Sequence, residues 1–255
     1  MRRRVDWLWF VVIGLIAGFM SGLFGVGGGI LIVPLLITLA GFGQKRAAGT
    51  SLAAIVPTSL AGVITYAIHG DLALIAAAVL AVGSIIGAQI GSLLLHRLPK
   101  NVVQWAFIVF VLIIVVSLFF VVPSREADIH LGALSIIGLL VLGLAVGILS
   151  GILGIGGGAV IVPMLILLFG ASDLVAKGTS LAVMIPTAIS GTIGNSRRRN
   201  VDIPAALTIG LCACLTTSLG ALVAVAIDPM LGNILFAVFL LIIAIQLSVK
   251  AIRSR

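Results

Sequence analysis

The stretch SGLFGVGGGILIVPLLITLAG, residues 21–41, returns later in the chain as SGILGIGGGAVIVPMLILLFG, residues 150–170. The same offset of 129 residues relates GTSLAAIVPTSLAG, which starts at Gly49, to GTSLAVMIPTAISG, which starts at Gly178. Roughly half of the positions over residues 14–64 are identical to their partners, which chance does not produce. The sequence therefore predicts two membrane repeats, residues 1–123 and 124–255, that together form one domain.

The composition places these repeats in a membrane. Of the 255 residues, 62% are hydrophobic and only 9% are charged. The apolar residues come in runs of about 20, the length with which a helix crosses about 30 Å of hydrocarbon. The net charge of +8 is concentrated in short clusters at the ends of these runs. Such clusters indicate membrane topology rather than nucleic-acid binding.

Each repeat is expected to contain one apolar helix, a glycine loop, a short apolar segment and three long spans. The short segment has about 11 residues and covers only about half a bilayer. The fold class is therefore an all-α integral membrane protein with about eight hydrophobic segments, in which each repeat combines a re-entrant or broken glycine hairpin with three transmembrane helices. The predicted segments are residues 7–24, 30–40, 47–68, 72–95 and 102–122, then 129–153, 159–169, 176–194, 203–227 and 231–249.

The loop charges distinguish the two ways of threading a repeat. If the first helix and the short segment form a re-entrant hairpin, 13 of the 15 Lys and Arg residues lie on the side of the termini, with Arg125 and Lys177 on the other. If the two pieces form one broken crossing, the split is 10 to 5. Lys and Arg concentrate in cytoplasmic loops, so the hairpin is favoured. Three full crossings per repeat make the repeats inverted, in a multi-pass membrane protein with both termini cytoplasmic.

Glycines four residues apart recur on three of the predicted spans. Spacing of this kind presents a flat ridge that lets two helices approach closely in lipid. The ridges therefore predict helix packing rather than chemistry. They are Gly14, Gly18 and Gly22; Gly83, Gly87 and Gly91; and Gly143, Gly147 and Gly151.

The two glycine loops are the first candidate site. Glycines let backbone N–H groups converge without a Cβ in the way, and the helix that follows adds unpaired N–H groups and the positive end of its dipole. Two such loops meeting near the middle of the membrane would cradle an anion, although a tight turn with nothing bound explains the glycines as well. The candidate substrate-binding residues are Gly25, Gly27, Gly28, Gly29 and Pro34 in the first repeat, and Gly154, Gly156, Gly157, Gly158 and Pro163 in the second.

Two further motifs open and bend a long span in each repeat. Thr50 with Ser51, and Thr179 with Ser180, could cap a helix or donate hydroxyl hydrogen bonds to an oxyanion. A proline about two turns further in, Pro57 or Pro186, bends the helix and shapes the cavity or acts as a hinge. We include all six with the candidate substrate-binding residues.

Charged residues are expected only at span ends or in loops, with Asp173 among them and Lys177 outside the membrane. Buried carboxylates and histidines are the usual proton relays and cation sites, so a cation pump is disfavoured. An intramembrane serine protease is disfavoured too, because no histidine lies within a span. We expect no enzyme activity, no cofactor and no metal. The expected partners are a small anionic substrate and the lipid bilayer, without nucleic acid; a homodimer is compatible with the sequence.

The duplicated motif G-x-x-S-G-x-x-G-x-G-G-G-x-x-x-V-P, from Gly18 and from Gly147, is followed in each repeat by G-T-S-L. This pattern resembles the TauE/SafE family of sulfite exporters over essentially the whole chain. The resemblance implies a bacterial or archaeal transporter of the inner (cytoplasmic) membrane, for sulfite, sulfoacetate or related sulfur-containing organic anions. It also implies that the glycine and proline loops and the Thr-Ser positions line the substrate path. A passive anion channel is the alternative to a carrier.

Overall fold

The computed structural model describes residues 4–120 and 132–253, and these residues form ten helices. Each repeat contributes five helices in the same order, long, short, long, long, long. The helices of the first repeat are α1 (Arg4–Phe24), α2 (Gly29–Thr38), α3 (Gln44–Ile68), α4 (Leu74–Arg97) and α5 (Lys100–Phe120). Those of the second are α6 (Ala133–Leu153), α7 (Gly158–Phe169), α8 (Asp173–Arg197), α9 (Ile203–Ala226) and α10 (Pro229–Arg253).

All ten predicted segments are present as helices, with boundaries that differ by a few residues. The largest differences are four residues: α6 begins later and α10 ends later than predicted. The helices α1, α3 and α8 each begin three residues earlier. At α8 the earlier start has a local cause, because the Ser172 side chain accepts a hydrogen bond from the N–H of Val175 and caps the helix. The ends of the spans predicted at 102–122 and 129–153, and the loop between them, fall partly outside the described residues.

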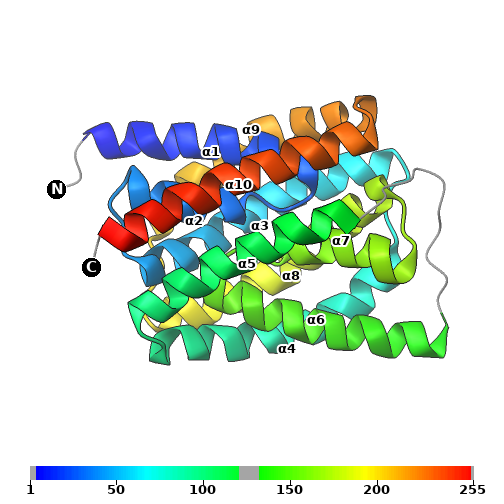
Figure 1. Ribbon diagram of the computed structural model, residues 1–255, viewed down its shortest axis with the longest axis horizontal. Coiled ribbons are helices and arrows are strands. Elements are labelled where there is room, and N and C mark those ends of the chain that lie inside the picture. The colour runs from blue at the N-terminus through cyan, green and yellow to red at the C-terminus, as the bar shows by residue number, and fades with distance from the viewer. Residues whose placement is uncertain (1–3, 121–131, 254–255) are drawn as a thin grey trace.

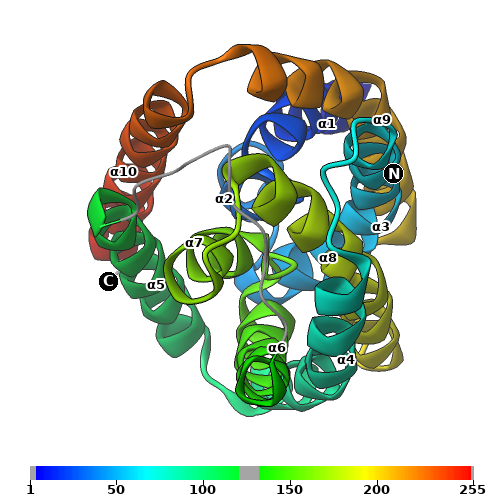
Figure 2. The same cartoon turned by 90° about the vertical axis from the view of Figure 1, so that its right-hand side faces the viewer.

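The long helices form a ring around the two short ones. Figure 2 shows α2 and α7 surrounded by the long helices. The ring includes the contacting pairs α1 and α9, α4 and α6, and α5 and α10. The contacts of one repeat are repeated by the other: α1 packs on α9 as α6 packs on α4, and α3 packs on α9 as α8 packs on α4. The helices α3 and α8 pack on each other, as do α5 and α10. Each of these contacts is therefore mapped onto its counterpart when the repeats are exchanged.

Glycine ridges hold the two closest helix pairs together, as predicted. Three glycines of α1 lie against backbone oxygens of α9, and their counterparts on α6 lie against backbone oxygens of α4, so a Cβ at any of the six would meet main chain at 2.6 Å or less. Only glycine fits at such a contact. The pairs are Gly14 with Ile209, Gly18 with Ala213 and Gly22 with Thr217, and Gly143 with Leu80, Gly147 with Ser84 and Gly151 with Ala88.

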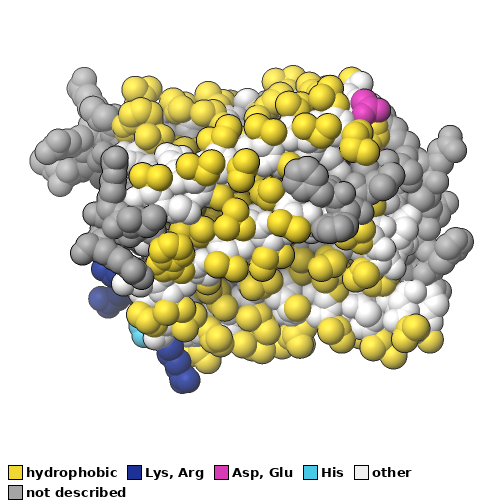
Figure 3. All heavy atoms as spheres, in the orientation of Figure 1, with side chains coloured by type: hydrophobic (Ala, Val, Ile, Leu, Met, Phe, Trp, Pro, Cys, Tyr) yellow, Lys and Arg dark blue, Asp and Glu magenta, His cyan; other side chains and the backbone are white. Residues whose placement is uncertain are grey.

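The surface of the bundle is that of a membrane protein. Eight of the helices in the described parts of the chain are long and apolar enough to cross a bilayer. Figure 3 shows hydrophobic side chains over most of the visible face, with Lys and Arg at one end of the long axis and an acidic side chain at the other. This division of apolar flanks and charged ends fits a bundle that stands upright in lipid.

The two repeats begin at opposite ends of the bundle. In Figure 1, α1 begins at the left-hand end of the bundle and α6 at the right-hand end, and the two termini lie at the same end. How the repeats are oriented in a membrane, and which side is cytoplasmic, stay predictions.

Candidate functional site

The two glycine loops lie against each other inside the ring. Each loop leaves a long helix through three left-handed glycines, with φ of 69°, 68° and 73° at Gly25, Gly27 and Gly28, and φ of 76°, 83° and 94° at their counterparts. A Cβ on Gly29 would lie 2.5 Å from the carbonyl oxygen of Ile155, and one on Gly158 would lie 2.8 Å from that of Gly25. Glycine is required twice over here, for the backbone conformation and for the contact between loops.

Both loops present buried N–H groups with no acceptor in the described parts of the protein. These are the N–H groups of Val26, Gly27, Gly28 and Ile30 in the first loop, and those of residues 155–159 in the second. All of these residues are buried. Buried backbone N–H groups are normally paired, because an unpaired one costs free energy comparable to a lost hydrogen bond. At the start of a helix, a cluster of such donors is an anion-binding arrangement.

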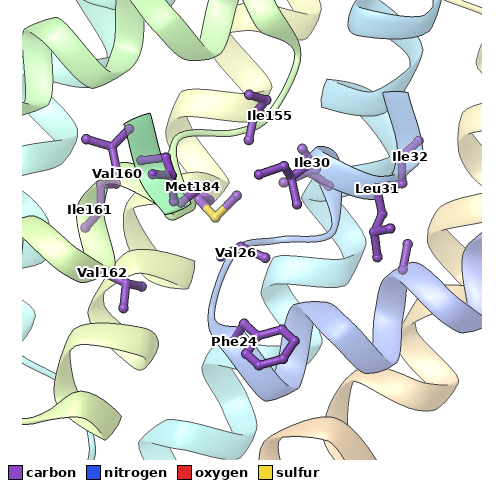
Figure 4. Packing of buried hydrophobic residues seen from close by; sticks show 14 of the residues in the cluster. Phe24, Val26, Ile30, Leu31, Ile32, Ile155, Val160, Ile161, Val162 and Met184 are labelled. Carbon is purple, nitrogen blue, oxygen red and sulfur yellow. The ribbon is translucent and has the colours of Figure 1, made fainter. Parts of the chain in front are cut away.

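Two apolar side chains fill the centre between the loops. Met184 of α8 touches both loops, because a Cβ on Gly27 or on Gly158 would lie 2.8 Å from its sulfur. Ile55 of α3, the counterpart of Met184 in the first repeat, would lie 3.3 Å from a Cβ on Gly27 and 3.0 Å from one on Gly156. Figure 4 shows the Met184 sulfur among hydrophobic side chains from both loops. The structure is therefore closed at the point where the two loops meet.

The Thr-Ser motifs of α3 and α8 lie at this site. In each motif the threonine hydroxyl and the serine hydroxyl have different surroundings. The hydroxyl oxygen of Thr50 accepts from the N–H of Asp202 (3.0 Å), and that of Thr179 accepts from the N–H of Ala73 (3.0 Å). The two threonines thus tie α3 and α8 to the residues just before α9 and α4. The serines that follow them are fully buried and differ from each other, as described below.

The prolines shape helices around the site. Pro34 and Pro163 are buried at the sixth position of α2 and α7, where each removes one helix N–H. Pro57 and Pro186 lie half-buried within α3 and α8. The ring of Pro57 packs on α9, where a Cβ on Gly210 would lie 2.5 Å from its Cγ.

Pro163 also borders an apolar cavity of about 390 Å³ between α5, α6 and α7. Side chains such as Val109, Phe110, Leu149 and Met164 line it. A lining of this kind offers little to an anion, so the cavity lies apart from the candidate anion site.

The structure corrects the expectation that no charged side chain lies within a span. Asp173 and Lys177 both belong to α8, are 2% and 9% exposed, and form an ion pair with Nζ 3.1 Å from Oδ2. The aliphatic stem of Lys177 packs directly on Gly25. The two charges can be buried because each has its partner one helical turn away. The second buried carboxylate, Asp202, pairs with Arg46 at 2.5 Å.

Two serines beside the loops were missed by the sequence interpretation. Ser21 and Ser150 occupy equivalent positions in the last turn before each loop, are at most 1% exposed, and have hydroxyls without a hydrogen-bond partner. The available signal was their place in the duplicated motif G-x-x-S-G. Their hydroxyls add two hydrogen-bond donors, one in the last helical turn before each loop.

The sequence as a whole matches the family described as "Sulfite exporter TauE/SafE", over residues 1–118 and 139–255. The chain belongs to the TauE/SafE family. It is therefore a multi-pass membrane transporter, and its glycine loops are features of a transport protein.

Relatives of the TauE/SafE chain are described in the same terms. It is 28% identical to the probable membrane transporter protein YunE of Bacillus subtilis (strain 168), over 96% of this chain and 98% of that protein. It is 30% identical to the probable membrane transporter protein YdhB of the same organism, over 75% and 80%. A probable membrane transporter protein of Haemophilus influenzae is 27% identical over 94% and 97%. No solved structure matches the chain.

Proposed function

We propose that this TauE/SafE protein exports small sulfur-containing anions, such as sulfite or sulfoacetate, across the cytoplasmic membrane by alternating access. The observation that carries the proposal is the set of buried, unpaired N–H groups where the two glycine loops meet. An oxyanion has acceptor oxygens only, and so can accept from every one of these donors.

The surroundings of the loops favour an anion over a cation or a neutral solute. The loops lead into α2 and α7, whose helix starts carry positive partial charge. The hydroxyls of Ser21, Ser51 and Ser150 are buried without a partner and can donate as well. Family membership supports transport, and the family description supports sulfite as the first anion to test.

A carrier fits the geometry better than the alternative, a passive channel. Met184 and Ile55 are fully buried and occupy the space between the loops, so an anion passes only when they move. A carrier exposes its site to one side at a time, and its transport is accelerated by substrate on the opposite side. We therefore expect counterflow of sulfite in proteoliposomes, and its absence would count against a carrier.

The site itself is tested by a matched pair of glycine variants. Gly28→Ala and Gly41→Ala both place a Cβ on a left-handed glycine, with φ of 73° and 67°. At Gly28 the Cβ would lie 2.9 Å from the carbonyl oxygen of Ala17, whereas at Gly41 nothing lies within 4 Å. We expect Gly28→Ala to abolish sulfite transport in a folded protein and Gly41→Ala to retain it. Equal transport by the two variants would contradict the proposed site.

A further inference from the structure

Although the repeats share one sequence pattern, their two glycine loops are held differently. We propose that the second loop, residues 154–158, and the hydroxyl of Ser51 together form the primary oxyanion-binding position. The first loop, which is anchored, bounds this position without providing the main binding groups. This inference rests on the proposed function and assigns the binding role to one half of the site.

Three contacts anchor the first loop. The Ser180 hydroxyl donates to the carbonyl oxygen of Gly25 at 2.9 Å, and the Tyr66 hydroxyl donates to that of Gly22 at 2.7 Å. Lys177 packs directly on Gly25, because a Cβ on this glycine would lie 2.6 Å from the Cα and Cβ of Lys177. One hydroxyl of α3 and one of α8 therefore donate to carbonyl groups at the start of this loop.

The equivalent residues of the other repeat, each 129 positions away, make the packing contact but neither of the two hydrogen bonds. Ser51 takes the place of Ser180, and its hydroxyl has no partner. Asn195 takes the place of Tyr66, and its amide donates to Gly191 of its own helix at 2.9 Å. Ala48 takes the place of Lys177 and packs on Gly154 through its backbone, without the long side chain of a lysine. The second loop therefore lacks both hydrogen-bond anchors of the first.

The position of Ser51 makes its hydroxyl available to a ligand at the second loop. Ala48, one turn earlier on the same face of α3, lies against Gly154, where a Cβ would meet its backbone. Ser51 is 0% exposed, and its hydroxyl does not bond back to the helix as the Thr58 hydroxyl does to Ala54. A buried hydroxyl without a partner is costly unless a ligand or a water completes it.

The second loop supplies the remaining donors. The five N–H groups of residues 155–159 have no acceptor in the described parts of the chain, and Ser150 adds a second unpartnered hydroxyl. An oxyanion accepts from N–H and O–H groups alike, and requires no charged side chain when enough donors converge on it. Ser21 and Ser150 are alike in the two repeats, so Ser51 is the hydroxyl that distinguishes the two loops.

The matched variants Ser51→Ala and Ser180→Ala test this assignment, because the two serines are equivalent in sequence. Sulfite binding to the purified full-length protein is measured by titration calorimetry, and thermal unfolding is followed in the same samples. We expect Ser51→Ala to weaken sulfite binding by about tenfold or more without loss of thermal stability, since a hydrogen bond to a charged group is lost. Ser180→Ala removes the hydrogen bond to Gly25 and should lower thermal stability, and it should weaken sulfite binding less than Ser51→Ala does.

The outcomes separate this inference from the proposed function. Sulfite binding by Ser51→Ala that equals the unmutated protein, or an equal loss of affinity in the two variants, would overturn the assignment and leave the transporter proposal standing. Failure of the unmutated protein to bind sulfite, sulfoacetate or thiosulfate would overturn the proposed function and the assignment with it. Ser51→Cys keeps the size of the side chain with a weaker donor, and should show the same loss if Ser51→Ala does not fold.

Discussion

The contact between the second glycine loop and α3 can be tested by comparing two glycines that end helices. Gly154 follows α6 and Gly170 follows α7, and both are left-handed, with φ of 76° and 66°. An alanine at either position adopts an unfavourable backbone conformation, which costs about 1–2 kcal/mol. The two positions differ in what the added Cβ would meet.

The structure sets the size of the difference. At Gly154 the Cβ would overlap the backbone of Ala48 and lie 2.7 Å from its carbonyl carbon, where ordinary contact begins at 3.4 Å; at Gly170 nothing lies within 4 Å. Because the obstacle is main chain, the loop must move away from α3. Overpacking of this kind costs about 1–3 kcal/mol in addition to the backbone strain.

The assay is thermal unfolding of the two variants in the same detergent. We expect Gly170→Ala to lower the melting temperature by a few degrees and Gly154→Ala to lower it by roughly twice as much or more, since 1 kcal/mol corresponds to about 2–4 °C in a chain of this size. Gly154→Ala should also weaken sulfite binding, because the added Cβ moves the second loop away from α3 and so away from the Ser51 hydroxyl. Equal melting temperatures for the two variants would refute the packing argument.

Three further predictions follow from other contacts. Gly87→Ala would place a Cβ against backbone atoms of α6 and should destabilise the protein by about 1–3 kcal/mol, whereas Gly232→Ala, with nothing within 4 Å, should be neutral or stabilising in thermal unfolding. Met184→Ala removes the side chain between the two loops and should raise passive sulfite leak from proteoliposomes; an unchanged leak would argue against a closed centre. Thr50→Val removes the acceptor of the Asp202 N–H and should cost about 1 kcal/mol of stability, with transport retained, as a melting curve and an uptake assay on one preparation would show.

Much of the fold could be predicted from the sequence because its signals are local. Apolar runs of membrane-spanning length predicted the long helices, and the offset of 129 residues predicted that the second repeat would contain the same elements as the first. The glycine ridges predicted close helix contacts, although the sequence does not say which helices meet. That α1 pairs with α9 and α4 with α6 depends on contacts between distant segments.

The candidate site was predicted in part. The glycine loops were expected to meet, and the structure brings them together. The buried pair of Asp173 and Lys177 was not expected, because both were placed at the edge of a span, where charged residues are usually exposed. The start of α8 is buried by neighbouring segments that no local pattern identifies.

The sequence by itself determined that this is a membrane protein of two repeats with glycine loops, because hydrophobic length, duplication and glycine spacing are carried by the order of residues. The transport function follows from the resemblance of the duplicated motif to the TauE/SafE family. Only the tertiary structure decided how the two loops differ. Ser51 and Ser180 stand in the same motif, G-T-S-L, yet one hydroxyl is unpartnered and the other holds Gly25. The physical reason is that a hydrogen bond depends on which distant backbone lies within reach, and that is set by packing.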